Sequence, residues 1–418
     1  MEFKKYKLRD LGTVDISGID KKSYEGEKPV RLCNFTDVYK NWAITKYHYP
    51  TLMKATAKDR DIEKFKIRKG QVAITKDSET RDDIGIPTYI ADDFDDVVLG
   101  YHCALITPGD ALDGQYLNAY LNTKMAKKYF EGYASGSGQR YTLTLDSIND
   151  IQIWLPDTRS QKRISKILSD IDRKIALNTR MNAELEAMAK QLYDYWFVQF
   201  DFPDENGNPY KSSGGKMVYN PTLKREIPEH WEVKRLSMLM EYSGGSQPPA
   251  SEFISEKKDG YIRFVQIRDY YTDSHLTYIP VSNKNKICNE TDIMIARYGA
   301  SLGRICYGLA GAYNVALAKV FPKKQVYKEF LRTYLKSSTF YDKINTIGTR
   351  CAQAGFNSED VQNIEIVMPR DETIIENFSL IMEHFFCSEL RNNKQNKYLT
   401  HLRDSLLPML MNGQVTVE

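Results

Sequence analysis

The chain has 418 residues, 42% of them apolar, and a formal net charge of +3, so it is long enough for two or three ordinary folded domains. No apolar run approaches the roughly 20 residues of a membrane helix, and the charge excludes a uniformly basic nucleic-acid binder. The whole-chain sum hides an uneven distribution, because residues 216–370 carry 22 Lys and Arg against 16 Asp and Glu, whereas residues 1–156 carry 23 of each. This local excess permits DNA contact without being diagnostic of it.

The cysteines argue against a disulfide framework or a zinc knuckle, because they lie far apart and form no Cys-x-x-Cys pair. The N-terminus does not resemble a signal peptide. We therefore expect a cytoplasmic protein that contacts no membrane and keeps its cysteines as buried free thiols. The six positions are 33, 103, 288, 306, 351 and 387.

The elements predicted over the first 156 residues return in the same order in the second half, which indicates an internal repeat. In "VRLCNFTDVYKN" (30–41) and "IRFVQIRDYYTD" (262–273), Arg31 and Asp37 match Arg263 and Asp269. The other matches are "KGQVAITK" (69–76) with "ETDIMIAR" (290–297), "CALITP" (103–108) with "LAKVFP" (317–322), "QYLNAYLN" (115–122) with "EFLRTYLK" (329–336), and "INDIQIWLP" (148–156) with "VQNIEIVMP" (361–369).

The spacing between the two copies falls from 232 residues at the first match to about 214 at the later ones. Most of the difference lies between residues 41 and 69, where the first copy holds roughly eleven extra residues. Insertions settle in surface loops. Each half is therefore predicted to be the same scaffold with different loops.

The glycine-rich stretch "GSGQRYTL" (136–143) has no Gly-x-Gly-x-x-Gly or Gly-Lys-Ser/Thr pattern, so it does not predict a nucleotide cradle. Its counterpart is "GTRCAQAGFNSEDVQN" (348–363), and both stretches precede a predicted strand. We expect a basic loop that approaches a phosphate backbone or simply makes a tight turn.

After Pro156 the apolar period becomes helical, and one helix is predicted over residues 159–197, about 58 Å long. Residues at alternating steps of four and three form a coiled-coil seam, and seven of the nine are apolar. The first seam is Ile164, Leu168, Ile171, Ile175, Asn178, Asn182, Leu185, Ala189 and Leu192. The second helix, over 372–411, repeats it as Phe378, Met382, Phe385, Glu389, Asn392, Asn396, Leu399, Arg403 and Leu406.

An apolar stripe on a long helix must be buried, and the equivalent helix is its obvious partner. Antiparallel packing would return the chain end towards Met1 and set the Asn178/Asn182 pair against Asn392/Asn396. Such an amide layer fixes register; the alternative is that these asparagines face solvent. The arrangement predicts two heads held apart by a stiff rod with approximate two-fold symmetry, which suits duplex DNA with its repeat of about 34 to 36 Å.

No catalytic constellation is present in the sequence. The histidines show no metal-ligand spacing, and His102 is expected to be a satisfied core residue. The acidic run "DDFDD" (92–96) predicts a solvated loop rather than a cation site. "GNPY" (207–210) and "YNPT" (219–222) are ordinary turn sequences and not methyltransferase loops.

The stretch "YDYWFVQFDFPDENGNPYKSSGGKMVYN" (193–220) and the following "REIPEHWEVKRL" (225–236) closely resemble the specificity subunit of Type I restriction-modification systems. The closing "LRDSLLPMLMNGQV" (402–415) is also similar, and "DIMIARYGASLGR" (292–304) resembles a strand-turn element of the family's recognition domains. The first module departs from the pattern, because "QVAITKDSETRDDIG" (71–85) is less glycine-rich.

The resemblance implies an α+β protein in which two similar α/β target-recognition domains are separated by two long antiparallel coiled-coil helices with pseudo-two-fold symmetry. Each domain is expected to read one half of a split double-stranded DNA site. Two methyltransferase subunits and, in the full complex, two restriction subunits are the implied partners. No cofactor is expected on this chain, whereas S-adenosylmethionine, ATP and magnesium are expected on the partners.

The expected parts of the chain are recognition domain one (1–156), the central helix (157–200), the linker with recognition domain two (201–371) and the C-terminal helix (372–418).

Candidate DNA-reading residues are the Arg, Lys, Gln and Tyr side chains on loops beside the repeated strands, because these types bind bases and phosphates. For each of them singly, a surface ion pair or plain solvation is an alternative. A coiled-coil scaffold without DNA readout and a self-sufficient DNA methyltransferase are the alternative functions; the missing cofactor turn argues against the latter. The candidates are Lys76, Arg81, Gln139, Arg140, Tyr141, Arg268, Arg297, Tyr298, Arg304, Arg350 and Gln353.

Overall fold

The computed structural model describes residues 2–136, 138–273, 275–348 and 358–415. The chain forms two compact units. Unit 1 comprises Met1–Asn178 and Lys394–Glu418, and unit 2 comprises Thr179–Asn393. The two long helices, α6 (Thr158–Tyr193) and α10 (Glu372–Met411), therefore each contribute one segment to each unit.

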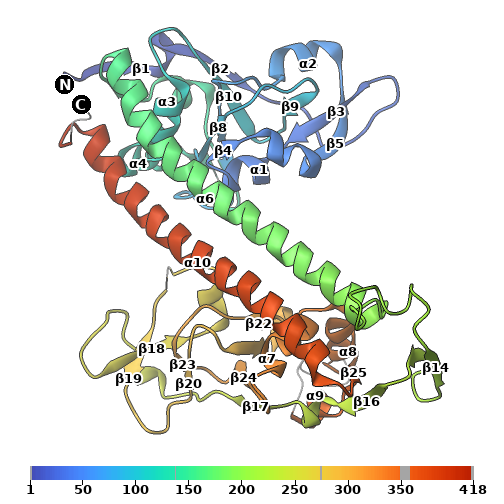
Figure 1. Ribbon diagram of the computed structural model, residues 1–418. Helices are drawn as coiled ribbons and strands as arrows, with labels where there is room; N and C mark the ends of the chain where they lie inside the picture. The colour runs from blue at the N-terminus through green and yellow to red at the C-terminus, as the bar shows by residue number, and fades with distance from the viewer. Residues whose placement is uncertain (1, 137, 274, 349–357, 416–418) are drawn as a thin grey trace. The chain divides into compact units, whose positions relative to one another are not determined.

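Unit 1 is built on a five-stranded sheet of order β2-β10-β6-β8-β4 and a three-stranded sheet of order β5-β3-β9 (Figure 1). The strands are β2 (Gly12–Ile16), β3 (Lys28–Cys33), β4 (Ala43–Ile44), β5 (Met53–Ala57), β6 (Val72–Thr75), β8 (Pro87–Ile90), β9 (Val97–Leu99) and β10 (Cys103–Pro108). In a small two-stranded sheet, β1 (Lys4–Lys7) pairs with β13 (Gln152–Leu155). In a small three-stranded sheet, β12 (Tyr141–Thr142) pairs with both β11 (Ser135–Gly136) and β7 (Asp77–Ser78). The helices are α1 (Phe35–Lys40), α2 (Asp59–Phe65), α3 (Gly114–Leu121), α4 (Lys124–Tyr133) and α5 (Leu145–Asn149).

Unit 2 repeats this plan with a sheet of order β17-β24-β21-β22 and a second sheet of order β19-β18-β23-β20. The strands are β17 (Met240–Gly244), β18 (Tyr261–Val265), β19 (Tyr278–Pro280), β20 (Ile287–Cys288), β21 (Ile293–Ala296), β22 (Ile305–Cys306), β23 (Gly311–Tyr313) and β24 (Leu317–Pro322). The pair β16 (Trp231–Arg235) and β25 (Glu365–Pro369) corresponds to β1 and β13, whereas the hairpin β14 (Met217–Asn220) and β15 (Arg225–Pro228) belongs to the linker. The helices are α7 (Tyr327–Leu335), α8 (Ser338–Gly348) and α9 (Ser358–Gln362).

The repeat predicted from the sequence is confirmed at the level of individual hydrogen bonds. In unit 1, the Lys76 amide donates to the His102 carbonyl oxygen (2.8 Å), and in unit 2 the Arg297 amide donates to the Ala316 carbonyl oxygen (2.9 Å). Parallel pairing recurs as well, between β3 and β9 and between β18 and β23. The two basic residues therefore leave equivalent strands at equivalent points.

The matched aspartates have the same structural role in both units. Asp37 accepts a hydrogen bond from the Asn34 amide (2.8 Å), and Asp269 accepts one from the Gln266 amide (2.9 Å). Each carboxylate thus caps the short helix that follows β3 or β18, satisfying an amide that the helix leaves unpaired. The extra residues of the first copy lie between 41 and 69 and include α2.

The two long helices run antiparallel in each unit, as predicted. In unit 1, Ile164 and Leu168 of α6 share a core with Leu407 and Leu410 of α10. Asp172 and Arg403 form an ion pair there at 2.8 Å. All the predicted seam residues are buried or half-buried, which confirms the seam. Its period places these side chains on one stripe, so burying them against the partner helix removes apolar surface from water.

In unit 2, the end of α6 continues into a π-helical turn, η3 (Asp194–Val198), and supplies an aromatic core. Trp196 and Phe197 pack against Phe378 of α10 with ring centroids 5.7 and 4.9 Å apart. Phe197 also contacts Trp231 of β16 (5.8 Å) and Phe330 of α7 (4.8 Å). Several aromatic residues of the stretch 193–220, on which the family resemblance rests, therefore belong to the unit 2 core. The predicted fold class, with two similar α+β domains and two long antiparallel helices, is confirmed.

The four seam asparagines form hydrogen bonds between α6 and α10, as expected for an amide layer. Asn178 is fully buried in unit 1 and donates to Gln395 (2.8 Å) and Asn396 (2.9 Å). In unit 2, Asn392 donates to the side chain of Asn182 (2.8 Å). The alternative that the asparagines face solvent is wrong for Asn178 and Asn392, which are both buried.

We expect Asn178→Ala to lower the free energy of unfolding of unit 1 by about 1 to 3 kcal/mol, because two part-buried hydrogen bonds between the helices are lost. Urea denaturation monitored by hydrogen exchange of unit 1 peptides measures this loss. Lys174→Ala is the control, because Lys174 is exposed on the same helix. Equal stability of the two variants would show that the amide contacts contribute nothing.

The expectation of buried free thiols holds for four cysteines, Cys33, Cys103, Cys288 and Cys306. It is wrong for Cys387, which is free but exposed on α10. Cys351 lies outside the described residues. Burial raises the pKa of the Cys103 thiol above its ordinary value, which keeps it protonated and inert.

Candidate nucleic-acid interface

Most predicted site residues of unit 1 lie around the small sheet β11-β12-β7, at the end of β6. The stretch "GSGQRYTL" is a β-hairpin in which Gly136 pairs with Tyr141. A Cβ at Gly136 would lie 2.0 Å from the Arg140 carbonyl oxygen, so only glycine fits this approach. The prediction of a tight turn is confirmed, and contact of this loop with a phosphate backbone stays a prediction.

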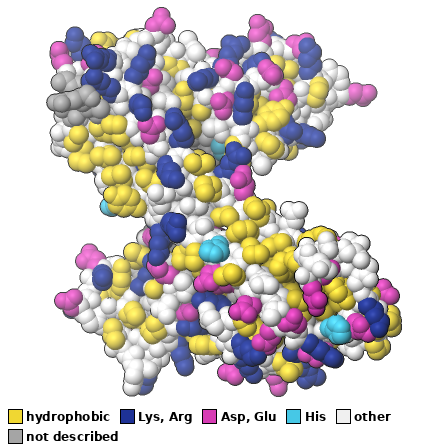
Figure 2. Space-filling model, viewed as in Figure 1, with side chains coloured by type: hydrophobic (Ala, Val, Ile, Leu, Met, Phe, Trp, Pro, Cys, Tyr) yellow, Lys and Arg dark blue, Asp and Glu magenta, His cyan; other side chains and the backbone are white. Residues whose placement is uncertain are grey.

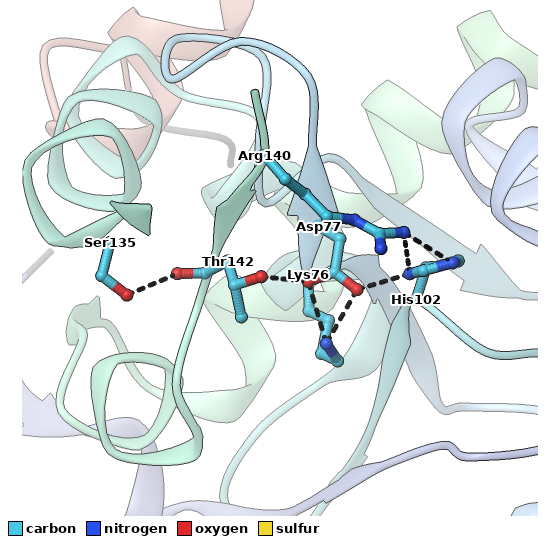
Figure 3. Close-up of polar contacts among 6 residues, drawn as sticks. All are labelled: Lys76, Asp77, His102, Ser135, Arg140 and Thr142. Atoms are coloured by element: carbon cyan, nitrogen blue, oxygen red, sulfur yellow. Dashed lines mark hydrogen bonds and ion pairs between the residues drawn. The ribbon is translucent and has the colours of Figure 1, made fainter. Parts of the chain in front are cut away.

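Asp77 is the centre of a polar network that joins three segments of unit 1, as Figure 3 shows. Its carboxylate accepts hydrogen bonds from Lys76 Nζ (2.8 and 2.9 Å) and from the Thr142 hydroxyl on β12, and one oxygen lies 2.6 Å from His102 Nδ1. Burial raises the pKa of Asp77, but the bonds from Lys76, Thr142 and His102 outweigh it and hold the pKa below its ordinary value. The carboxylate is therefore ionised and binds the hairpin to the end of β6.

Arg140 extends from the hairpin over the His102 ring. Its Nη2 lies 2.9 Å from Nε2 and 3.0 Å from Nδ1 of that ring, and nearly equal distances place the guanidinium over the ring face. Arg140 is exposed. Lys76, in contrast, is only 9% exposed and its ammonium is neutralised by Asp77, so this placement favours a structural role for it.

The remaining predicted residues of unit 1 occupy different environments. Arg81 is exposed and donates to the carbonyl oxygens of Glu131 (2.9 Å) and Gly132 (3.3 Å), near the end of α4. Gln139 is exposed in the turn of the hairpin, and Tyr141 is half-buried against the core of the unit. Lys76, Arg140 and Tyr141 are thus brought together, and Arg81 lies apart from their network.

In unit 2, the hairpin between β21 and β22 presents a second group of basic and aromatic side chains. The Arg304 guanidinium lies 3.8 Å from the centre of the Tyr271 ring, and that tyrosine is 65% exposed. Arg297 lies 5.1 Å from the Tyr298 ring and donates to the Val315 carbonyl oxygen (3.3 Å). A Cβ at Gly244 would be 2.7 Å from Arg297 Nη1, so the glycine leaves room for this guanidinium.

Arg268 lies on η6 (Ile267–Tyr270), the short helix before Tyr271. It is exposed, and its Nη2 donates to the Thr277 hydroxyl at 3.4 Å. Tyr271, the residue directly after this helix, lies next to Arg304. Arg350 and Gln353, the other two candidates of this half, lie outside the described residues.

Charge on the visible face of each unit is mixed, with Lys and Arg side chains interspersed among Asp and Glu (Figure 2). Such a surface does not hold an anion by its overall field. Contact with nucleic acid would then depend on local groups such as Arg304 with Tyr271, in which a guanidinium stacks on an aromatic ring.

Three residues of these groups were missed in the sequence: Asp77, His102 and Tyr271. The expectation of a core residue is wrong for His102, since its side chain is 21% exposed and belongs to the polar network. The sequence holds one signal for Tyr271, because Tyr39 takes its place in the first copy of the repeat. No local pattern signals the Asp77–His102 contact, which joins residues 25 positions apart.

The described residues contain no group of three His, Cys, Asp or Glu side chains that could hold a metal ion. The acidic run at 92–96 caps backbone amides instead, since Asp92 accepts from the Lys46 amide (2.8 Å) and Asp93 from the Lys69 amide (3.0 Å). Within the described part of the chain, every helix is too short or too polar to cross a membrane.

Two stretches of the chain, residues 2–187 and 228–400, match a family model described as the Type I restriction modification DNA specificity domain. The Type I restriction enzyme MjaIX specificity subunit of Methanocaldococcus jannaschii is 26% identical over 327 residues, which cover 75% of this chain and 72% of the relative. The HindI specificity subunit of Haemophilus influenzae is 25% identical over 408 residues, 84% of this chain and 87% of the relative.

Among solved structures, the Type-I restriction-modification system S subunit from M. genitalium superposes with a TM-score of 0.62 at 15% identity. The superposition covers 98% of this chain and 96% of that chain. At this identity the likeness concerns the fold, which is shared over almost the whole length of both proteins.

Proposed function

Since this chain belongs to the Type I restriction-modification specificity family, with two DNA specificity domains, we propose that it is the sequence-reading subunit of a restriction-modification complex. Each unit reads one half of a bipartite double-stranded DNA site. The observation that carries the proposal is the repeated scaffold: β6 and β21 hold equivalent places in the two units, and Arg140 and Arg304 lie on hairpins beside them. Two copies of one reader suit two separated half-sites.

The proposed readers act in two ways. Arg140 and Arg304 are placed on hairpin loops and are suited to contact with guanine, whereas Arg81, Arg268 and Arg297 suit phosphate contacts that fix orientation. Tyr298 is 43% exposed and offers a ring for contact beside Arg297. The paired segments of α6 and α10 set the length of the unread gap.

The chain itself is proposed to be non-catalytic. Two methyltransferase subunits, which use S-adenosylmethionine, and two restriction subunits, which use ATP and magnesium, would supply the chemistry. The long helices and the linker are the proposed docking region. We propose that the complex works in the cytoplasm.

Sequencing of modified adenines in the host genome tests the proposal, because it yields a two-part motif with a fixed gap if each unit reads a half-site. Gel-shift measurements with the methyltransferase partner, across a salt series, test DNA contact itself, since phosphate contacts make affinity fall steeply with salt. Salt-independent or absent binding would favour a protein scaffold. Methyl transfer by the purified chain alone would favour a self-sufficient methyltransferase.

Arg304→Ala is expected to weaken binding to the duplex that carries the motif by about 1 to 3 kcal/mol, with the loss confined to one half-site. The control is Arg235→Ala, which removes the same charge from an exposed position at the end of β16. Competition with duplexes altered in one half at a time measures the effect. An unchanged motif together with unchanged affinity would remove Arg304 from the readers.

A further inference from the structure

Unit 2 contains a pocket of about 530 Å³ that is lined by none of the proposed DNA-reading residues, and we call it the linker pocket. It lies where η3, the linker, the pair β16–β25 and the start of α10 meet (Figure 1). Four aromatic rings line it, those of Trp196, Phe202, Tyr210 and Trp231. All but Tyr210 are only 4 to 6% exposed, so these rings form the floor of the pocket.

The aromatic floor is held in place by its own contacts. Phe202 stacks on Tyr210 with ring centroids 4.7 Å apart, and it contacts Trp231 at 5.1 Å. The Tyr210 hydroxyl donates to the Lys216 carbonyl oxygen (3.0 Å), which fixes that ring to the linker. Because the rings are already ordered, an apolar or cationic group can bind against them without the entropic cost of ordering them.

The rim of the pocket is acidic. Asp204, Glu205 and Asp371 line it, and its described lining residues include no Lys or Arg. Glu205 and Asp371 are exposed, whereas Asp204 is half-buried and accepts hydrogen bonds from two amides of its own turn (2.8 and 2.9 Å). Hydrogen bonds from Thr373 hold the pKa of Asp371 below its ordinary value, so this carboxylate is ionised at neutral pH.

Basic residues flanking the pocket are directed to other carboxylates. The Nε of Arg370 lies 3.7 Å from Glu232, and Lys216 pairs with Glu229 at 2.5 Å. His230 is the one basic side chain among the described lining residues, and it is 79% exposed with its Nε2 3.9 Å from Glu229. The carboxylates of the rim therefore give the pocket a negative mouth above an apolar floor.

This combination selects a ligand by charge and by shape. The carboxylates repel phosphates, so the pocket does not suit nucleic acid. A cation is attracted both by the carboxylates and by the aromatic rings. Pro203, Pro228 and Pro369 add apolar surface, against which the methylene stem of a Lys or Arg side chain can pack while its charged end reaches the rim. A compact ion would leave this apolar surface uncovered.

About half of the lining residues come from a part of the chain outside the recognition domains. The two stretches that match the DNA specificity domain, 2–187 and 228–400, leave out residues 188–227. Trp196, Phe202, Asp204, Glu205 and Tyr210 all lie in the omitted stretch. Their position favours a role in assembly over a role in reading DNA.

We propose that the linker pocket is a docking site for the methyltransferase subunit and receives one of that subunit's Lys or Arg side chains. The inference rests on the proposed function, because it takes that subunit as the partner. It goes further by naming the groups that receive the partner: the carboxylates of Asp204, Glu205 and Asp371 bind the cation, and the prolines and aromatic rings cover its stem.

The test measures the Kd between the full chain and the methyltransferase subunit for substitutions of Glu205, which is exposed, so that they leave the fold intact. Glu205→Gln removes the charge and is expected to weaken binding about threefold. Glu205→Lys sets two cations against each other and is expected to weaken binding more than about tenfold, whereas Glu205→Asp should bind like the wild type. The matched control is Glu226→Lys, the same charge change at an exposed position of β15 outside the pocket, with no loss of affinity expected.

A charge exchange identifies the group that enters the pocket. A panel of methyltransferase variants, each with one Lys or Arg changed to Glu, is measured against the wild-type chain and against Glu205→Lys. The variant that has lost the docking side chain is expected to bind the wild-type chain weakly and to regain affinity with Glu205→Lys. Added salt is expected to shrink both effects, because charges at the rim are screened.

The outcomes separate this inference from the proposed function. Equal affinities of Glu205→Lys and Glu226→Lys, or no rescue in the whole panel, would overturn docking at this pocket even if the wild-type complex methylates a two-part motif. Saturable binding of free arginine amide that Glu205→Lys abolishes, with no change in methyltransferase affinity, would assign the pocket to a small cation and would also overturn it. A wild-type complex that yields no two-part motif would instead overturn the proposed function. Graded loss from Glu205→Gln to Glu205→Lys, with rescue by one panel member, supports the inference.

Discussion

Replacing Phe378 by alanine is expected to lower the free energy of unfolding of unit 2 by about 3 to 5 kcal/mol. The ring is fully buried and packs edge-to-face against Phe197 (86° between planes) and Phe330 (78°). It also contacts Trp196, so the substitution removes aromatic contacts to η3 and α7 and leaves a cavity where α10 joins the unit.

A matched control on the same helix is Leu380→Ala. Leu380 is 58% exposed, and its loss is expected to change stability by no more than about 0.5 kcal/mol. Hydrogen exchange of peptides from η3 and β16, measured over a urea series, follows the unit directly. If the two variants unfold at the same urea concentration, the aromatic cluster is not the core of this unit.

The second large effect is expected from Asp77→Asn, which should destabilise unit 1 by about 3 kcal/mol at neutral pH. Lys76 and Asp77 are 9% and 5% exposed, so removing the carboxylate charge leaves a buried ammonium without its partner. The double variant Lys76→Met with Asp77→Asn removes both charges and is expected to lose less than half as much. A double variant as unstable as Asp77→Asn would show that the ion pair is not the cause.

The same pair predicts a pH dependence with a defined sign. The folded state holds the pKa of Asp77 below its ordinary value, so the ionised carboxylate contributes stability at every pH above about 4, the pKa of an unfolded aspartate. That contribution is lost as pH falls through the folded pKa. The stability difference between wild type and Asp77→Asn should therefore be constant from neutral pH to about pH 4 and shrink below it; a difference that grows on acidification would contradict this assignment.

Most of the fold could be predicted because it repeats and because helical periodicity is long-ranged. Five matches in one order located the equivalent strands of the two units, and the seam from Ile164 to Leu192 located α6 within a few residues. The π-helical end at η3 was not predicted, since it depends on packing of Trp196 and Phe197 into the unit 2 core rather than on local preference.

The site was less accessible to sequence reasoning. Lys76 was selected because it is basic and follows a strand, but its burial beside Asp77 results from the approach of β12, about 65 residues later in the chain. The stacking of Arg304 on Tyr271 likewise joins separate segments. Residue type predicted which side chains are able to contact DNA, whereas their orientation depended on contacts between distant segments.

The most direct test of the central claim is to map methylated adenines made by the assembled complex carrying Arg140→Ala or Arg304→Ala. The wild-type chain is expected to give a two-part motif, and each variant is expected to relax a different half while the gap stays constant. A single contiguous motif, or relaxation of the same half by both variants, would contradict the account of one reader in each unit.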